Sequence, residues 1–259
     1  MSHLNLDDAL TTEQVPPNWL VPEFLHKGTI TLLAGDAGIG KSVLSYHLSM
    51  CLAAGLPFLG TPTAAARVLY FDEENSLRDS QEYLRWNWVG LGRPDITILK
   101  ASLRVEHFSL TANSPAHYQQ MVDITHGYAP DLIVIDTASP TCRIVDENDN
   151  GEASAAMRAL RAVRASGGPE TSMLILKHAR FSKDTGRDIR GAKAWKGECD
   201  QLAFHVASRG RPKIDGLRHT HIEPSKTRAF GLRAPIYIAP TWTDDTHSGI
   251  ILARTTQPN

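Results

Sequence analysis

The sequence has few of the features that mark secreted, metal-binding or membrane proteins. Its three cysteines, Cys51, Cys142 and Cys199, lie far apart and form no CxxC pair. We therefore expect reduced thiols rather than disulfides or a zinc site. No apolar run approaches the roughly 20 residues that cross a bilayer, and residues 1–14 are polar and acidic, unlike a signal segment. These absences favour a soluble cytoplasmic protein with no membrane partner.

An excess of charge of one sign is also lacking, because 27 Lys and Arg nearly balance 28 Asp and Glu. The overall charge therefore does not indicate a nucleic-acid partner, and any such surface must come from local clusters. The chain has 259 residues, of which 42% are hydrophobic and 21% charged. It is long enough for one domain with a fully buried sheet.

From residue 28 onward, apolar β-rich runs alternate with amphipathic stretches. Strands are expected at 29–34, 67–72, 96–99, 131–136 and 173–177, with helices at 41–54, 76–89, 116–126 and 152–165. Continuous apolar strands separated by helices predict an α/β fold, with a mostly parallel twisted sheet covered on both faces. After residue 200, four short strands at 202–208, 219–223, 236–238 and 250–253 predict an antiparallel extension.

Residues 1–27 are expected to form an N-terminal arm, and residues 28–259 the domain. Three prolines between positions 16 and 22 oppose a regular helix in that part of the arm. Apolar side chains, among them Trp19 and Phe24, could pack the arm on the body or on a neighbouring subunit.

Residues 35–42 match the phosphate-loop pattern G-x-x-x-x-G-K-[ST] without a gap. Glycines let backbone N–H groups turn toward phosphate oxygens, and the positive end of the following helix adds to the attraction. Lys41 is expected to reach the β- and γ-phosphates of ATP, and the Ser42 hydroxyl to bind Mg²⁺. The strand before the loop and the helix after it argue against a chance glycine turn. The predicted cofactor-binding residues are Gly35, Asp36, Ala37, Gly38, Ile39, Gly40, Lys41, Ser42 and Val43.

Further polar residues stand where predicted strands end. Asp136 fits the acid that holds magnesium, although an Asp at such a position also caps turns. One of Asp72, Glu73 and Glu74 can orient and deprotonate the water that attacks the γ-phosphate, unless these acids form a solvated loop. His178 fits either a γ-phosphate sensor or a structural histidine, and its strand should neighbour that of Asp136.

These elements, in this order, resemble the RecA-like ATPase core and, more narrowly, the RepA-type hexameric replicative helicases. The resemblance spans about residues 15 to 230. It is carried by the segment leading into the phosphate loop (19–35), by 70–75, by Asp136 and Thr137 with 146–150, by His178 with Lys183, and by 190–196 followed by Asp200. The resemblance places the catalytic acid at Glu74.

The family resemblance implies a ring with ATP bound between subunits and a cation supplied by the neighbour. The segment Lys226-Thr227-Arg228 resembles the Lys-x-Arg pair of ring helicases. Arg228 is then the expected arginine finger and Lys226 its companion, with Lys196 a competing candidate. A basic turn between two strands is the alternative interpretation.

Two loops bind single strands in RecA-like rings, and here they are expected at about 140–150 and 179–193. The first is acidic, which argues against strong binding. The second has five basic and two acidic residues, a balance of +3, which favours sequence-tolerant binding to a phosphate backbone, although a mixed-charge loop is usually only solvated. The predicted nucleic-acid residues are Arg180, Lys183, Arg187, Arg190 and Lys193.

The expected function is therefore a hexameric ATPase that moves along single-stranded DNA, as a replicative helicase does. The alternative is a nucleotide-switched assembly or regulatory module that binds ATP without unwinding nucleic acid. A small-molecule phosphotransferase is disfavoured because no lid or acceptor pocket is evident. Since no DNA-reading module is visible, sequence-specific recognition would need a partner such as a replication-initiation protein.

Overall fold

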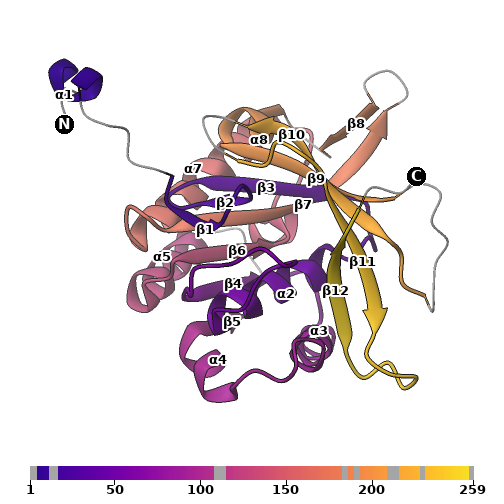
Figure 1. Ribbon diagram of the computed structural model, residues 1–259. Coiled ribbons are helices and arrows are strands. Elements are labelled where there is room, and N and C mark those ends of the chain that lie inside the picture. Colours follow the sequence, from indigo (N-terminus) through magenta and orange to yellow (C-terminus); the bar gives the residue numbers. More distant parts are fainter. Residues whose placement is uncertain are drawn as a thin grey trace.

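The computed structural model describes residues 5–11, 17–107, 115–182, 186–189, 193–208, 216–227 and 231–256. A single large sheet runs through this part of the chain (Figure 1). Its parallel strands, in spatial order, are β9 (Gln201–Ala207), β3 (Ile30–Gly35), β7 (Ser172–Ser182), β6 (Leu132–Asp136), β4 (Val68–Asp72) and β5 (Leu103–Glu106). Beyond β9 the sheet continues antiparallel through β10 (Thr220–Thr227), β11 (Ile236–Trp242) and β12 (Ile250–Thr255).

Helices cover both faces of this sheet, because its strands are apolar on both sides. Along β3, Leu32 belongs to one apolar layer and Leu33 to the other. The first layer lies under α5 (Pro115–Tyr128), α7 (Asn150–Ser166) and α8 (Lys193–Glu198), and the second under α2 (Lys41–Ala54) and α3 (Leu77–Gly90). The predicted α/β fold, a mostly parallel sheet with an antiparallel C-terminal extension, is confirmed.

The strand predicted at 96–99 is wrong, because this segment begins the helix α4 (Ile96–Ser102). The Asp95 side chain accepts a hydrogen bond from the Thr97 N–H at 2.7 Å, which caps the first turn. Ile96 and Ile98 are largely exposed, so these β-branched side chains do not pack within a sheet. The edge strand is instead the following β5.

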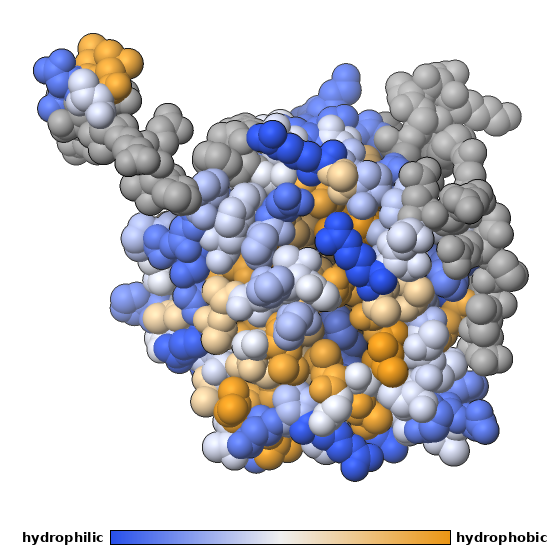
Figure 2. Space-filling model, viewed as in Figure 1, coloured by the Kyte–Doolittle hydropathy of each residue, from blue (hydrophilic) through white to orange (hydrophobic). Residues whose placement is uncertain are grey.

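The N-terminal segment packs on the body of its own chain from Trp19 onward. Strands β1 (Trp19–Val21) and β2 (Leu25–His26) form a small antiparallel pair, and Leu20 and Phe24 are buried in the same apolar layer as α2. The helix α1 (Leu6–Thr11) stands apart from the body and exposes apolar side chains (Figures 1 and 2). Among the described helices, none is long and apolar enough to cross a membrane.

Candidate functional site

The phosphate loop connects the end of β3 to the start of α2, and its glycines are required for two different reasons. Gly38 and Gly40 have φ values of 69° and 93°, in the left-handed region, while an added Cβ would meet nothing within 4 Å. Gly35 is a close approach instead, since its Cβ would lie 2.6 Å from the carbonyl oxygen of His205 on β9. The loop therefore needs glycine for backbone conformation at two positions and for packing at a third.

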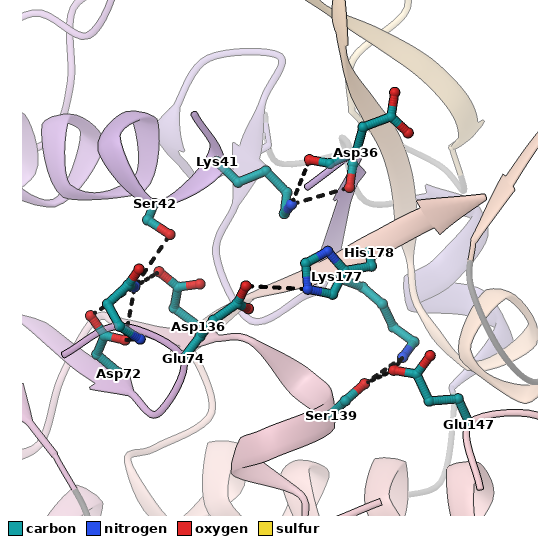
Figure 3. Close-up of polar contacts among 12 residues, drawn as sticks. Asp36, Lys41, Ser42, Asp72, Glu74, Asp136, Ser139, Glu147, Lys177 and His178 are labelled. Carbon is teal, nitrogen blue, oxygen red and sulfur yellow. Dashed lines mark hydrogen bonds and ion pairs between the residues drawn. The ribbon is translucent and has the colours of Figure 1, made fainter. Parts of the chain in front are cut away.

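Lys41 is 6% exposed, and its ammonium lies over the loop that precedes it. Its Nζ donates to the carbonyl oxygens of Gly35 at 3.1 Å and Asp36 at 3.0 Å (Figure 3). Burial lowers the pKa of Lys41, and the nearby charges of Glu74 and Asp136 oppose that shift. The ammonium is thus held by neutral carbonyls within a surrounding negative field, where it can meet phosphate oxygens.

Two buried carboxylates lie side by side where β4 and β6 end, because the register pairs Asp72 with Asp136. The Tyr70 hydroxyl donates to Asp136 Oδ2 at 2.6 Å, and Asn75 Nδ2 lies 3.3 Å from the same oxygen. Burial, and then the charge of Asp72, raise the pKa of Asp136 to about 7. Its other oxygen, Oδ1, is buried without a hydrogen-bond partner in the described structure.

This arrangement fits a magnesium ion, which prefers oxygen ligands and usually keeps several waters. The Asp136 carboxylate lies beside the Ser42 hydroxyl (Figure 3). Within the described ranges, no group of three or more His, Cys, Asp or Glu is placed to hold a metal by itself. A cation here would therefore depend on Ser42, Asp136, water and the phosphates of the nucleotide.

The structure gives the three consecutive acids at the end of β4, Asp72, Glu73 and Glu74, different environments. Asp72 accepts hydrogen bonds from the Tyr46 hydroxyl at 2.8 Å and the Ser80 hydroxyl at 2.7 Å. The Glu73 carboxylate lies 3.1 Å from Arg143. Glu74 instead turns toward the phosphate loop, which the sequence alone could not establish.

Glu74 lies opposite His178, with its Oε1 3.2 Å from His178 Nε2 (Figure 3). That hydrogen bond is the main reason that the pKa of Glu74 falls to about 2, and Thr137 and Lys41 act in the same direction. His178 is on β7, in register with Gly35 of β3. The expected pairing of its strand with that of Asp136 is confirmed. The structure thus brings together Lys41, Ser42, Glu74, Asp136 and His178.

Some polar residues of the site were not predicted. Asn75 bridges Asp72, Asp136 and Ser42, and only its position directly after three acids hinted at it. Lys177 is fully buried, and its Nζ donates to Ser139 Oγ at 3.0 Å and lies 3.7 Å from Glu147 (Figure 3). A lysine inside an apolar strand was the signal that could have found this contact.

Lys226 is engaged within its own chain. Its Nζ donates to three main-chain carbonyls at the end of α8, those of Lys196 at 2.6 Å, Gly197 at 3.2 Å and Cys199 at 2.7 Å. The Lys196 side chain is itself exposed, with its Nζ 4.0 Å from Asp188. Arg228, the expected finger, lies outside the described residues.

Much of the predicted second loop is a β-hairpin. Strand β7 continues past His178 to Ser182 and pairs antiparallel with β8 (Gly186–Ile189), and this hairpin extends beyond the sheet (Figure 1). The backbone of Arg180 and Arg187 belongs to these strands, and Lys193 is exposed at the start of α8. Lys183 and Arg190 lie outside the described residues.

The phosphate loop between a central parallel strand and a helix, with acids at the ends of neighbouring strands, defines a P-loop NTPase with a RecA-like core. The chain belongs to the AAA domain family, whose model matches residues 2–184. The protein is therefore an AAA-type P-loop ATPase. A sequence comparison with curated proteins gives no match.

Proposed function

We propose that this protein is an ATP-hydrolysing motor of the cytoplasm that forms a hexameric ring and moves along single-stranded DNA, in the manner of a RepA-type replicative helicase. The observation that carries the proposal is the continuity of β7. His178 on this strand contacts Glu74 beside the phosphate loop, and the same strand runs on into the hairpin with β8. A change at the nucleotide can therefore reach a basic hairpin through one strand.

In this proposal, Lys41 and the loop N–H groups bind the phosphates, and Ser42 and Asp136 hold the magnesium ion. When bound, this ion neutralises charge on the β- and γ-phosphate oxygens. Glu74 orients the attacking water and accepts its proton. A carboxylate with a pKa near 2 is a weak base, so we expect the His178 hydrogen bond to shift from Glu74 to the γ-phosphate before cleavage.

In the proposed ring, the neighbouring subunit supplies a further positive charge to the bound nucleotide. Lys226 fixes the end of α8. We assign to Arg228, two residues later in the sequence, the role of contacting the nucleotide of the neighbouring subunit. Lys196 is the other candidate for this role, since it is exposed at the same end of α8. A replication-initiation protein is the kind of partner that would load such a ring at a defined sequence.

The test is the rate of ATP hydrolysis with and without single-stranded DNA, together with displacement of an annealed strand. We expect stimulation of at least about tenfold, with DNA binding that weakens steeply with salt because phosphates are neutralised. Reversing two charges of the predicted second loop in Lys183→Glu/Arg187→Glu should remove the stimulation. Arg158→Glu, an exposed arginine on α7, is the matched control and should respond to DNA like the wild type.

Hydrolysis without stimulation and without strand displacement would overturn the helicase proposal. The nucleotide-switched module would then be the better description. Loss of hydrolysis in Lys41→Ala confirms in either case that the measured turnover belongs to this site.

A further inference from the structure

A cavity of about 490 Å³ opens directly beside the phosphate loop. One wall is formed by the loop and the start of α2, including Gly40 and Val43. The opposite wall is formed by Trp86 of α3 and by the antiparallel strands, including Ile238 and Trp242 of β11. The lining is mainly apolar, and segments that are distant in sequence contribute to it.

The cavity lies on the side of the loop away from the catalytic acids. Strand β3 has β7 on one side and β9 on the other. Glu74, Asp136 and His178 belong to the β7 side, whereas His205 of β9 and the strands that follow it line the cavity. A ligand that binds the loop through phosphates therefore has room for its other end here.

The antiparallel strands that line the cavity pack closely against α3. A Cβ at Gly90 would lie 1.7 Å from the carbonyl oxygen of Ile250, and one at Gly249 would lie 2.5 Å from Val89 Cγ1. The ring of Trp86 meets the ring of Trp242 edge-to-face, with centroids 5.3 Å apart. The two tryptophans are therefore held in place by α3 and the hairpin of β11 and β12.

We propose that this cavity binds the purine base and ribose of the nucleoside triphosphate, with Trp242 and Trp86 providing the aromatic surface for the base. The inference rests on the proposed nucleotide site and identifies which part of the chain selects the base. A cavity of this size with apolar walls fits a flat heteroaromatic group, and aromatic rings bind bases by stacking. Because a purine offers a larger ring surface for stacking than a pyrimidine does, purine triphosphates bind more tightly than pyrimidine triphosphates.

The experiment compares the affinity of ATP, CTP and inorganic tripolyphosphate, each with Mg²⁺, for the full-length protein. Trp242→Ala should weaken ATP binding about tenfold, as expected for the loss of one stacking partner, and leave tripolyphosphate binding unchanged. Trp88→Ala is the matched control, because Trp88 is on the same helix but lines a separate cavity with Met50 and Leu99. It should change neither affinity.

Unchanged tripolyphosphate binding also shows that the variant is folded, and Trp242→Phe, which keeps an aromatic ring, should recover most of the ATP affinity. Equal weakening of ATP and tripolyphosphate, or wild-type ATP affinity in both Trp242→Ala and Trp86→Ala, would overturn the base site. CTP binding as tight as ATP binding would also overturn it. If the wild type binds neither ATP nor tripolyphosphate, the nucleotide site of the proposed function fails as well.

Discussion

Three adjacent acids of similar chemistry have three different environments. Each acid contacts different side chains, which come from other segments of the chain. Asp72 is held by Tyr46 of α2 and Ser80 of α3, and Glu73 is held by Arg143 from the segment after β6. Glu74 faces His178 and the field of Lys41. Among the three acids, Glu74 is therefore the one that lies near the phosphate-loop lysine.

Glu74→Gln should therefore bind MgATP with nearly wild-type affinity but cleave it at least about 100-fold more slowly, because an amide cannot accept the proton of the attacking water. Binding is measured with a fluorescent ATP analogue, and cleavage by phosphate release. Glu73→Gln is the matched control, and it should retain cleavage because its partner is Arg143. Loss of cleavage in Glu73→Gln alone would move the base one residue earlier.

The residues of the phosphate loop could be predicted from the sequence because their spacing itself encodes the chemistry. The choice among the acids could not be derived from the residues themselves, and only the family resemblance pointed to Glu74, because their environments depend on tertiary contacts with Tyr46, Ser80 and Arg143. The orphaned oxygen of Asp136 and the buried ammonium of Lys177 also cannot be recognised from the sequence alone. Both depend on how separate segments of the chain pack together.

At the scale of elements, α2 and α3 are joined by a buried polar contact. His47 of α2 is 3% exposed, and its Nδ1 lies 3.1 Å from Asn87 Oδ1 of α3. The Asn87 amide in turn donates to the carbonyl oxygen of Val43 at 3.1 Å. This contact fixes α3, which carries Trp86, against the helix that begins at the phosphate loop.

Because burial lowers the pKa of His47 to about 4, the folded protein keeps this ring neutral where the unfolded chain would protonate it. Its contribution to the unfolding free energy is complete above about pH 6.5 and is lost as the pH falls toward 4. Below pH 6 this loss approaches about 1.4 kcal/mol per pH unit. Urea denaturation between pH 8 and 5 should show it as a difference in slope between the wild type and His47→Gln.

The difference in slope isolates His47 because the other groups are common to both proteins. The raised pKa of Asp136 acts with the opposite sign over part of this range, and His205, whose pKa burial lowers to about 3, acts with the same sign. His126→Gln, an exposed histidine on α5, should follow the wild type. Parallel curves for the wild type and His47→Gln would contradict the prediction.

Most elements could be predicted because apolar runs of strand length and amphipathic helices alternate clearly. The failures have local causes. The run at 96–99 reads as a strand by composition, but Asp95 caps it as a helix, and tertiary context overrides a short β-branched run. The hairpin of β7 and β8 was expected as a loop because its many polar residues give no apolar strand pattern. The pairing of Ala179 with Ile189 was therefore not predicted.

At the scale of the whole molecule, one chain brings together the phosphate loop and the residues to which the proposed function assigns magnesium binding, proton acceptance and γ-phosphate sensing. The antiparallel strands that close the sheet bring Lys226 to the end of α8 rather than to its own phosphate loop. The fold of one chain follows from its own pattern of apolar residues. The contacts between chains do not, which is why ring formation is a proposal that must be tested with mixed subunits.

If Arg228 acts on the neighbouring subunit's nucleotide, Arg228→Ala alone should lose hydrolysis by about 10³-fold or more, and Lys41→Ala should lose it completely. Mixing the two variants in equal amounts should restore activity, since a Lys41→Ala subunit can offer its arginine to the intact loop of an Arg228→Ala neighbour. With random assembly, about a quarter of the interfaces in a ring would be complete.

The matched control is a mixture of Lys41→Ala with Glu74→Gln. Lys41 and Glu74 lie on the same face of one chain, so no interface of that mixture contains both. Recovery in the first mixture and not in the second places the arginine in trans. No recovery in either mixture contradicts the shared site, and recovery in both contradicts the assignment of Lys41 and Glu74 to one subunit.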